Sequence, residues 1–317
     1  MNTILVAGAG QLGSRHLQGL KKSSHELDIW VYDLSKDSLV VAEERYNQIE
    51  SSIAMKAHFV SDLSLVPQNI DVVIVATGSK PRAQIVKDIL STKSVEYMVL
   101  EKFLFPRLFE YEEIGNLVNE KGVKTWVNCP RRMFAGYEYI KSLLDNTKPV
   151  EMSFKGGEWG MCCNTIHFVD IFMYLNGQTD FLFDIDGLLP EVIDSKRPGY
   201  VEVLGTESFK TATLDKLTLT SLSEFQGTPL LEINNGDYRI IYNESSGEVH
   251  INDKVFKFPV CLQSSLTGNL VDSILDKGNC KLAPYVESAA YHQNYLRKIA
   301  PFINKIKGWS SDSCPIT

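Results

Sequence analysis

The segment GAGQLG, residues 8–13, constrains the fold of this 317-residue chain more than any other feature. It follows four apolar residues and precedes a helical pattern, so it lies at a strand-to-helix turn. In such a turn the first glycine allows a tight bend, the second lets backbone approach a pyrophosphate, and the third lets the helix pack on the strand. Gly8, Gly10 and Gly13 have this spacing. The segment therefore predicts dinucleotide binding rather than a purely structural turn.

An acidic residue at the end of the next strand-like run supports this interpretation. Asp33 lies 20 residues after Gly13, where a carboxylate can accept hydrogen bonds from ribose hydroxyls. Its charge would repel the extra phosphate of NADP, and Leu34 and Ser35 follow it in place of a basic residue. We expect NAD as the cofactor, with NADP less favoured. The turn residues expected to contact it are Gly8, Gly10, Gln11, Leu12 and Gly13.

Strand-like and helical patterns alternate through the first part of the chain. The strand-like runs are 3–7, 28–33, 72–76, 97–101 and 124–128, and helical runs lie between them at 11–22, 38–46, after Pro81 and at 108–120. Strands that alternate with helices must be parallel, with helices on both faces of the sheet. Residues 1–128 are therefore predicted to form a doubly wound, Rossmann-type domain of an α/β protein.

The pattern changes after about Pro130. Helical stretches at 135–144 and 164–175 flank a strand at 151–155, and several strand-like runs separated by Gly, Asn and Asp follow between 200 and 258. Such turn signals are typical of antiparallel sheets. We predict a second, α+β domain over residues 129–307, with an open and mainly antiparallel sheet. The helical patterns at 262–275 and 284–306 could pack on either domain, and a Ser-rich, loose tail is expected at 308–317.

Composition narrows the class of partner. A formal net charge of -7 gives no broad attraction to nucleic acid or to an anionic membrane surface, so a small molecule is expected instead. No apolar run reaches the roughly 20 residues of a membrane-spanning helix, and no signal peptide is apparent, so we expect a cytoplasmic protein. The six cysteines form no C-x-x-C pair or Cys/His cluster, so no metal site and no disulfide framework are predicted.

Polar residues follow two of the expected parallel strands. Ligands of open α/β sheets gather at the carboxyl ends of the strands. Ala76, Thr77 and Gly78 end one strand, and the pair Glu101 and Lys102 ends the next. These five residues are predicted to lie at the cofactor, although a lone lysine at such a place is more often a solvated ammonium group.

A second group of polar residues lies on the helical pattern near residue 170. Cys163, His167, Asp170 and Tyr174 share one face of that helix, and Asn164 adjoins it. The rest of the helix is largely apolar, so this face must meet a cavity, a partner group or water. A histidine that is merely satisfied by Asp170 in a packed interface would account for the pattern equally well.

The order of these motifs resembles the glucose-fructose oxidoreductase, inositol dehydrogenase and MocA family over nearly the whole chain. The pair Glu101-Lys102, followed some 65 residues later by His167-x-x-Asp170, carries most of the resemblance. The family implies NAD(P)-linked redox chemistry on sugars, cyclitols or amino-sugar derivatives, including a role in surface glycan biosynthesis. It also implies a homodimer or homotetramer through the sheet of the second domain.

The resemblance also implies roles for individual residues. Lys102 would hydrogen-bond the reacting oxygen, His167 would be the acid/base, and Asp170 would orient the histidine or bind a substrate hydroxyl. A side chain that titrates near neutrality suits such proton transfer. The other residues expected at the cofactor or the substrate are Asn128, Arg132, Trp159, Cys163 and Asn164.

Three departures from the family leave alternatives open. Phe103 stands where the family has the proline of Glu-Lys-Pro, Arg82 replaces a common histidine, and Cys163 replaces the aspartate four residues before the catalytic histidine. The missing carboxylate motivates the alternative of a catalytically silent dinucleotide-binding sensor or subunit. Reduction of an imine or a tetrapyrrole-type substrate is a third possibility, which the polar surroundings of His167 and Arg132 disfavour.

Overall fold

The computed structural model describes residues 1–145 and 147–317, which form two compact units. Unit 1 comprises residues 1–105, 109–130 and 261–286, and unit 2 comprises residues 106–108, 131–260 and 287–317. Each unit has its own sheet and its own buried core. The predicted fold class, a parallel Rossmann sheet followed by a mainly antiparallel sheet, is confirmed.

Unit 1 is built on a seven-stranded sheet with the order β15-β6-β5-β4-β1-β2-β3. All its neighbouring strands pair in parallel except β15 with β6. Its central strands are continuous apolar runs because both faces are covered. The strands are β1 (Asn2–Ala7), β2 (Leu27–Tyr32), β3 (Met55–Val60), β4 (Asn69–Val75), β5 (Ser94–Glu101), β6 (Lys124–Asn128) and β15 (Ala283–Pro284).

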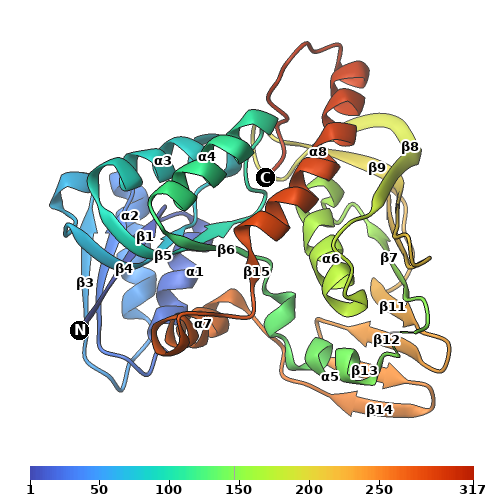
Figure 1. Cartoon of the computed structure of the whole chain (residues 1–317), viewed down its shortest axis with the longest axis horizontal. Coiled ribbons are helices and arrows are strands. Elements are labelled where there is room, and N and C mark those ends of the chain that lie inside the picture. The colour runs from blue at the N-terminus through green and yellow to red at the C-terminus, as the bar shows by residue number, and fades with distance from the viewer. Residues whose placement is uncertain (146) are drawn as a thin grey trace. The chain divides into compact units, whose positions relative to one another are not determined.

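Helices cover both faces of this sheet (Figure 1). Helices α3 and α4 lie on one face, and α1 and α7 lie on the other. The helices of unit 1 are α1 (Gln11–Leu20), α2 (Lys36–Asn47), the 3₁₀ turn η1 (Leu63–Leu65), α3 (Ser79–Thr92), α4 (Leu108–Glu120) and α7 (Gln263–Lys277). The sequence patterns predicted most of these elements to within two residues, whereas β3 and β15 were not predicted.

The predicted boundary of the second domain, residues 129–307, is corrected at helix α7. This helix lies within that range but belongs to unit 1. It packs closely on α1, where a Cβ on Gly268 would lie 2.8 Å from the carbonyl oxygen of Gly19. The carboxylate of Asp272 also accepts a hydrogen bond from the Ser24 amide at 2.8 Å. Two glycines and one carboxylate thus attach the helix to a segment some 250 residues earlier, which no local pattern reveals.

Unit 2 is built on an eight-stranded sheet with the order β14-β13-β12-β11-β7-β10-β9-β8. Its neighbouring strands pair antiparallel except β7 with β10, which pair in parallel. The strands are β7 (Glu151–Gly157), β8 (Leu182–Asp194), β9 (Val201–Lys210), β10 (Lys216–Leu222), β11 (Leu230–Asn234), β12 (Arg239–Asn243), β13 (Glu248–Ile251) and β14 (Lys254–Lys257). The long strand β8 was not predicted.

The helices of unit 2 are η2 (Pro130–Met133), α5 (Ala135–Leu143), α6 (Met161–Asn176) and α8 (Tyr285–Lys307). Aromatic contacts attach α8 to the sheet, since the rings of Phe183 and Tyr295 stack at 5.0 Å. Helix α6 ends at Gly177, whose φ of 71° allows its amide to cap the helix. This glycine accounts for the predicted end of the helix near residue 175.

The end of the chain, residues 314–317, is not loose as expected from the serine content of residues 308–317, whereas residues 308–312 are exposed. Cys314, Ile316 and Thr317 are buried. The Val201 amide donates to the Pro315 carbonyl and the Cys314 amide donates to the Pro106 carbonyl, each at 2.9 Å. Apolar anchors and backbone hydrogen bonds thus hold the C-terminus against unit 2, which composition alone does not indicate.

A carboxyl group lies in the core of unit 2. Glu207 of β9 is 0% exposed and accepts hydrogen bonds from Thr165 Oγ1 at 2.6 Å and from the Tyr295 hydroxyl at 2.8 Å. Burial raises the pKa of Glu207 to about 7, against the opposing effect of these two hydrogen bonds. The folded protein therefore holds a proton there that the unfolded chain releases near pH 4.5.

We expect Glu207→Gln to flatten the dependence of stability on pH. In the wild type the raised pKa favours the folded state below about pH 4.5, and that contribution is lost as the pH rises to about 7. The loss is on the order of 3 kcal/mol in the free energy of unfolding. Urea denaturation at pH 5 and pH 8 measures it. Exposed Glu191 provides the control Glu191→Gln, and an equal pH dependence in wild type and Glu207→Gln would contradict the assignment.

Over residues 1–145 and 147–317, no helix has both the length and the apolar character needed to cross a membrane. In the same part of the chain, no three His, Cys, Asp or Glu side chains are grouped so that they could hold a metal ion.

Candidate active site

The glycine turn has the geometry of a phosphate cradle. Gly8 has φ of 103°, and a Cβ there would lie 3.0 Å from backbone of Ala76 and Thr77. A Cβ on Gly13 would lie 1.8 Å from the Gly8 carbonyl oxygen, so only glycine lets α1 approach β1 this closely. A Cβ on Gly10, by contrast, would meet nothing within 4 Å. The second glycine therefore leaves open space beside the backbone, where a pyrophosphate would lie.

The N-terminus of α1 is suited to bind that pyrophosphate. Its N-cap residue is Gly10, which has no side chain that could accept hydrogen bonds from the backbone amides of the first turn. Gln11 is exposed and Leu12 is half-buried in this turn. Backbone N–H groups and the helix dipole both favour phosphate there. These residues fit NAD, because no side chain of the turn occupies the space above Gly10.

Asp33 lies beside the glycine turn, as its spacing predicts. Its Oδ2 accepts the Ala9 amide at 2.7 Å and its Oδ1 accepts the Ser35 amide at 2.8 Å. The half-buried carboxylate is thus held by backbone on two sides and keeps further lone pairs for ribose hydroxyls. Its interaction with the cofactor stays a prediction.

Removal of this carboxylate is expected to change the preference between the two cofactors. Asp33→Ala should raise the Kd for NAD by about 10–100-fold, since hydrogen bonds to a charged group are worth about 1.5–3 kcal/mol. Binding of NADP should change much less, because the substitution also removes repulsion of its extra phosphate. Titration of protein fluorescence with each nucleotide measures both constants. Asp37→Ala, on the exposed first turn of α2, is the control, and equal losses for both nucleotides would count against this role.

Glu101 and Asn128, both predicted to contact the cofactor, form a buried network in unit 1. Each is 2% exposed, and Asn128 Nδ2 donates to Glu101 Oε1. His16 Nε2 lies 2.9 Å from the same oxygen, and His16 Nδ1 lies 3.0 Å from Thr267 Oγ1. Burial alone would raise the pKa of Glu101, but the hydrogen bond and charge of His16, together with the hydrogen bond of Asn128 and the charge of Arg82, lower it. The sequence did not point to His16, because its partners lie 85 and 251 residues away.

Arg132 and Asp170, predicted at the substrate, form a buried ion pair in unit 2. Arg132 Nε donates to Asp170 Oδ2 at 2.9 Å, and Arg132 Nη2 donates to Glu287 Oε1 at 2.6 Å. Burial raises the pKa of Asp170 to about 6, although the Arg132 guanidinium acts in the opposite direction. Arg132 and Asp170 are therefore partners of each other in the structure. Their contacts with a substrate stay predictions.

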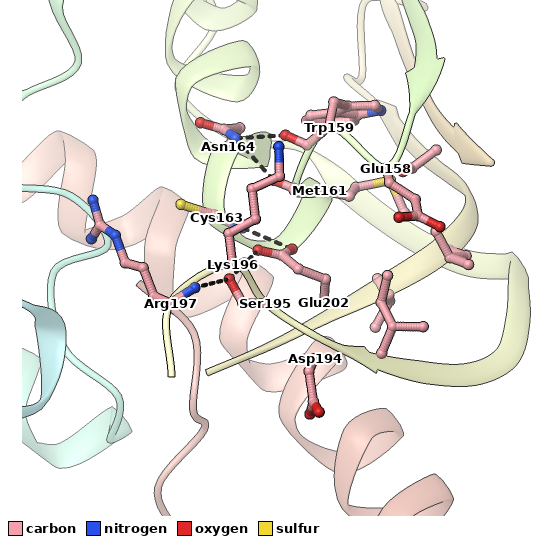
Figure 2. A pocket seen from close by; sticks show the side chains of 15 residues that line it. Glu158, Trp159, Met161, Cys163, Asn164, Asp194, Ser195, Lys196, Arg197 and Glu202 are labelled. Carbon is pink, nitrogen blue, oxygen red and sulfur yellow. Dashed lines mark hydrogen bonds between the residues drawn. The ribbon is translucent and has the colours of Figure 1, made fainter. Parts of the chain in front are cut away.

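The predicted polar face of α6 begins at a cavity of about 310 Å³ within unit 2. Trp159, Cys163 and Asn164, three of the residues expected to bind substrate, line it together (Figure 2). The Asn164 side chain donates to the carbonyls of Trp159 and Gly160 at 2.9 and 3.0 Å, which leaves its own carbonyl oxygen as an acceptor. His167 is half-buried one turn further along the helix.

A carboxylate that sequence reasoning missed also lines this cavity. Glu202 of β9 is 6% exposed, and its Oε2 accepts the Cys163 amide at 3.3 Å. The carboxylate absent from the side chain at position 163 is therefore present beside the same turn of α6, supplied by a neighbouring strand. No local signal marks Glu202, since it lies 39 residues away in an ordinary strand pattern.

Lys102 belongs to unit 1 and His167 belongs to unit 2. Lys102 is half-buried directly after β5, and its peptide bond to Phe103 is cis. The surroundings of Lys102 are therefore those within unit 1, and the surroundings of His167 are those within unit 2. The predicted meeting of the two side chains beside the nicotinamide stays a prediction.

The parallel sheet, the glycine cradle and the acidic residue after β2 together define a Rossmann domain built for a dinucleotide. Residues 2–129 match the model of the oxidoreductase family with an NAD-binding Rossmann fold. Over these residues the chain is similar to this family of oxidoreductases, and the predicted resemblance, the oxidoreductase class and NAD as the cofactor are confirmed. No curated protein matches the sequence.

Solved structures share the fold over nearly the whole chain at low sequence identity. UDP-N-acetylglucosamine 3-dehydrogenase GnnA from Acidithiobacillus ferrooxidans is 11% identical with a TM-score of 0.73, covering 96% of this chain and 98% of that one. GenD2 from gentamicin A biosynthesis, solved in complex with NAD, is 14% identical with a TM-score of 0.71, covering 96% and 95%. A putative myo-inositol dehydrogenase from Sinorhizobium meliloti 1021 is 12% identical with a TM-score of 0.65, covering 96% and 98%.

Proposed function

We propose that this protein transfers hydride between NAD and a hydroxyl or keto carbon of a sugar, cyclitol or amino-sugar derivative. The observation that carries the proposal is the cavity at the start of α6, which Asn164 and Glu202 help to line, in a chain whose residues 2–129 match an NAD-binding oxidoreductase family. The solved structures of similar fold include dehydrogenases named for UDP-N-acetylglucosamine and myo-inositol, which are substrates of this class.

The cavity suits a small polyhydroxylated ligand. Its volume of about 310 Å³ lies at the small end of the range of about 300–1,000 Å³ for small-molecule sites. The Glu202 carboxylate and the Asn164 carbonyl oxygen accept hydrogen bonds from hydroxyl groups, and the Trp159 ring adds an apolar surface. An extended apolar ligand, such as a tetrapyrrole, would leave these polar groups without partners.

The chemistry requires a proton to move as hydride leaves the carbon. NAD, when bound, takes up that hydride. We propose that His167 removes the hydroxyl proton and that the Lys102 ammonium stabilises the negative charge that develops on the oxygen. Asp170 and Arg132 would hold the α6 segment that carries His167, since Arg132 Nε of η2 donates to Asp170 of α6 at 2.9 Å.

A substrate panel tests the proposed function. Reduction of NAD is followed by its change in absorbance, with myo-inositol, simple hexoses, hexuronates and UDP-N-acetylglucosamine as the probes. Turnover of any member supports the proposal, and turnover of the nucleotide-linked sugar alone would favour a role in glycan biosynthesis. Tight NAD binding without turnover across the panel would instead support a silent sensor or subunit. The homodimer or homotetramer and the cytoplasmic location stay predictions.

A further inference from the structure

Arg82 is a buried cation at an unusual position. It lies in the first turns of α3 and is only 1% exposed. A positive charge near the N-terminus of a helix meets the positive end of the helix dipole, and its burial removes water from the guanidinium. Such a side chain is retained only where nearby acceptors compensate for both costs.

Those acceptors are backbone carbonyls from two separate loops. Arg82 Nη2 donates to the carbonyl of Thr77, in the loop that follows β4. Arg82 Nη1 donates to the carbonyls of Phe103 and Leu104, the latter at 2.8 Å, in the loop that follows β5. Strands β4 and β5 are parallel neighbours, with Val75 opposite Leu100, so both loops leave the same edge of the sheet. The guanidinium therefore joins the two loops through their backbone.

Both loops carry residues predicted to take part in the reaction. Thr77 is expected at the cofactor, and Lys102 directly precedes the two carbonyls that Arg82 Nη1 binds. Rigid backbone after Lys102 limits where its ammonium group can go, and a displacement of about 1 Å at a reacting group can lower a rate by about 10²-fold.

We infer that Arg82 is a positioning residue, which fixes the Lys102 loop against the Thr77 loop by hydrogen bonds to carbonyls of both. The inference rests on the role proposed for Lys102. A planar guanidinium can serve acceptors in two directions at once, whereas the single nitrogen of a lysine can reach only one loop at a time. Arg82, which stands where the family has a common histidine, thus has a physical role.

The matched variants are Arg82→Lys, which keeps the charge, and Lys87→Ala, which removes a partly exposed cation of the same helix. We expect Arg82→Lys to lower kcat by about 10²-fold with little change in the KM for substrate. Hydrogen exchange of the amides in residues 102–105 and 76–78 should become at least about 10-fold faster, since the loops lose their link. Lys87→Ala should match the wild type in both measurements.

The inference requires both effects together. Unchanged exchange with lowered kcat, or faster exchange with unchanged kcat, would overturn it. If Arg82→Lys fails to fold, Arg82→Gln, which removes the charge and keeps an amide donor for one loop, replaces it and is expected to behave alike. If the wild-type protein turns over no sugar, the proposed function fails separately, and hydrogen exchange together with the Kd for NAD then decides whether Arg82 holds the two loops.

Discussion

Turnover is expected to fall by about 10²–10⁴-fold when either Lys102 or His167 is replaced by alanine. Lys102→Ala removes the ammonium that would stabilise developing negative charge, and His167→Ala removes the group that would accept the proton. Neither side chain is fully buried, so the melting temperature should stay within a few degrees of the wild type. Initial rates of NAD reduction at saturating NAD measure the effect.

The same pair tests whether the two residues act on one substrate atom. Two groups that act as a unit show strongly non-additive losses, so the double variant should be little slower than the slower single variant. Independent sites would instead give losses that multiply. The exposed residues Lys121 and His250 supply the control substitutions Lys121→Ala and His250→Ala. Retained turnover in both single variants at Lys102 and His167 would remove this mechanism.

Local pattern was sufficient for the elements that carry these residues. Strand β5 is an apolar run that ends at Glu101, and helix α6 shows apolar residues over most of its circumference and a glycine after its last turn. Both signals depend on neighbours within a few residues, which is the range over which strand and helix periodicity acts. The positions of Lys102 and His167 at the ends and faces of these elements could therefore be predicted.

The surroundings of these residues could not be predicted, because they are made by contacts far apart in the chain. Glu101 meets His16, Arg82 meets the loop after β5, and Cys163 meets Glu202 of β9. Periodicity indicates that a position is buried, but it does not say which side chain faces it. The same reason explains why the sequence left the packing of α7 open and why the burial of the C-terminal residues was not expected.

Position 163, where the aspartate of the family is missing, illustrates the difference between a local sequence pattern and the contacts in the structure. From the sequence alone, Cys163 removes a carboxylate from the expected proton pathway. In the structure, Glu202 of β9 places a carboxylate at the amide of Cys163, in the first turn of α6. A carboxylate that one substitution removes from a motif can thus be supplied to the same turn by a residue outside the motif.

Substitutions in the glycine turn should separate the two roles that its glycines have. Gly13→Ala would place a Cβ 1.8 Å from the Gly8 carbonyl oxygen, so α1 must move away from β1. We expect the free energy of unfolding to fall by about 1–3 kcal/mol, as overpacking typically costs, and NAD binding to be lost. Gly10→Ala would meet no protein atom within 4 Å, and its φ of -66° suits alanine, so stability should be unchanged.

The effect of Gly10→Ala should appear only in the affinity for the nucleotide. The new methyl group would occupy the space where backbone approaches the pyrophosphate, and the Kd for NAD should rise by at least about 10-fold. Calorimetric titration with NAD and thermal melts of the same samples measure the two effects together. Gly122→Ala is a poor control because its φ of 67° disfavours alanine, whereas Asp37→Ala, on the exposed first turn of α2, leaves the glycine turn unchanged and should alter neither measurement. Unchanged NAD affinity in Gly10→Ala would mean that the pyrophosphate lies elsewhere, and the assignment of this turn as its cradle would have to be withdrawn.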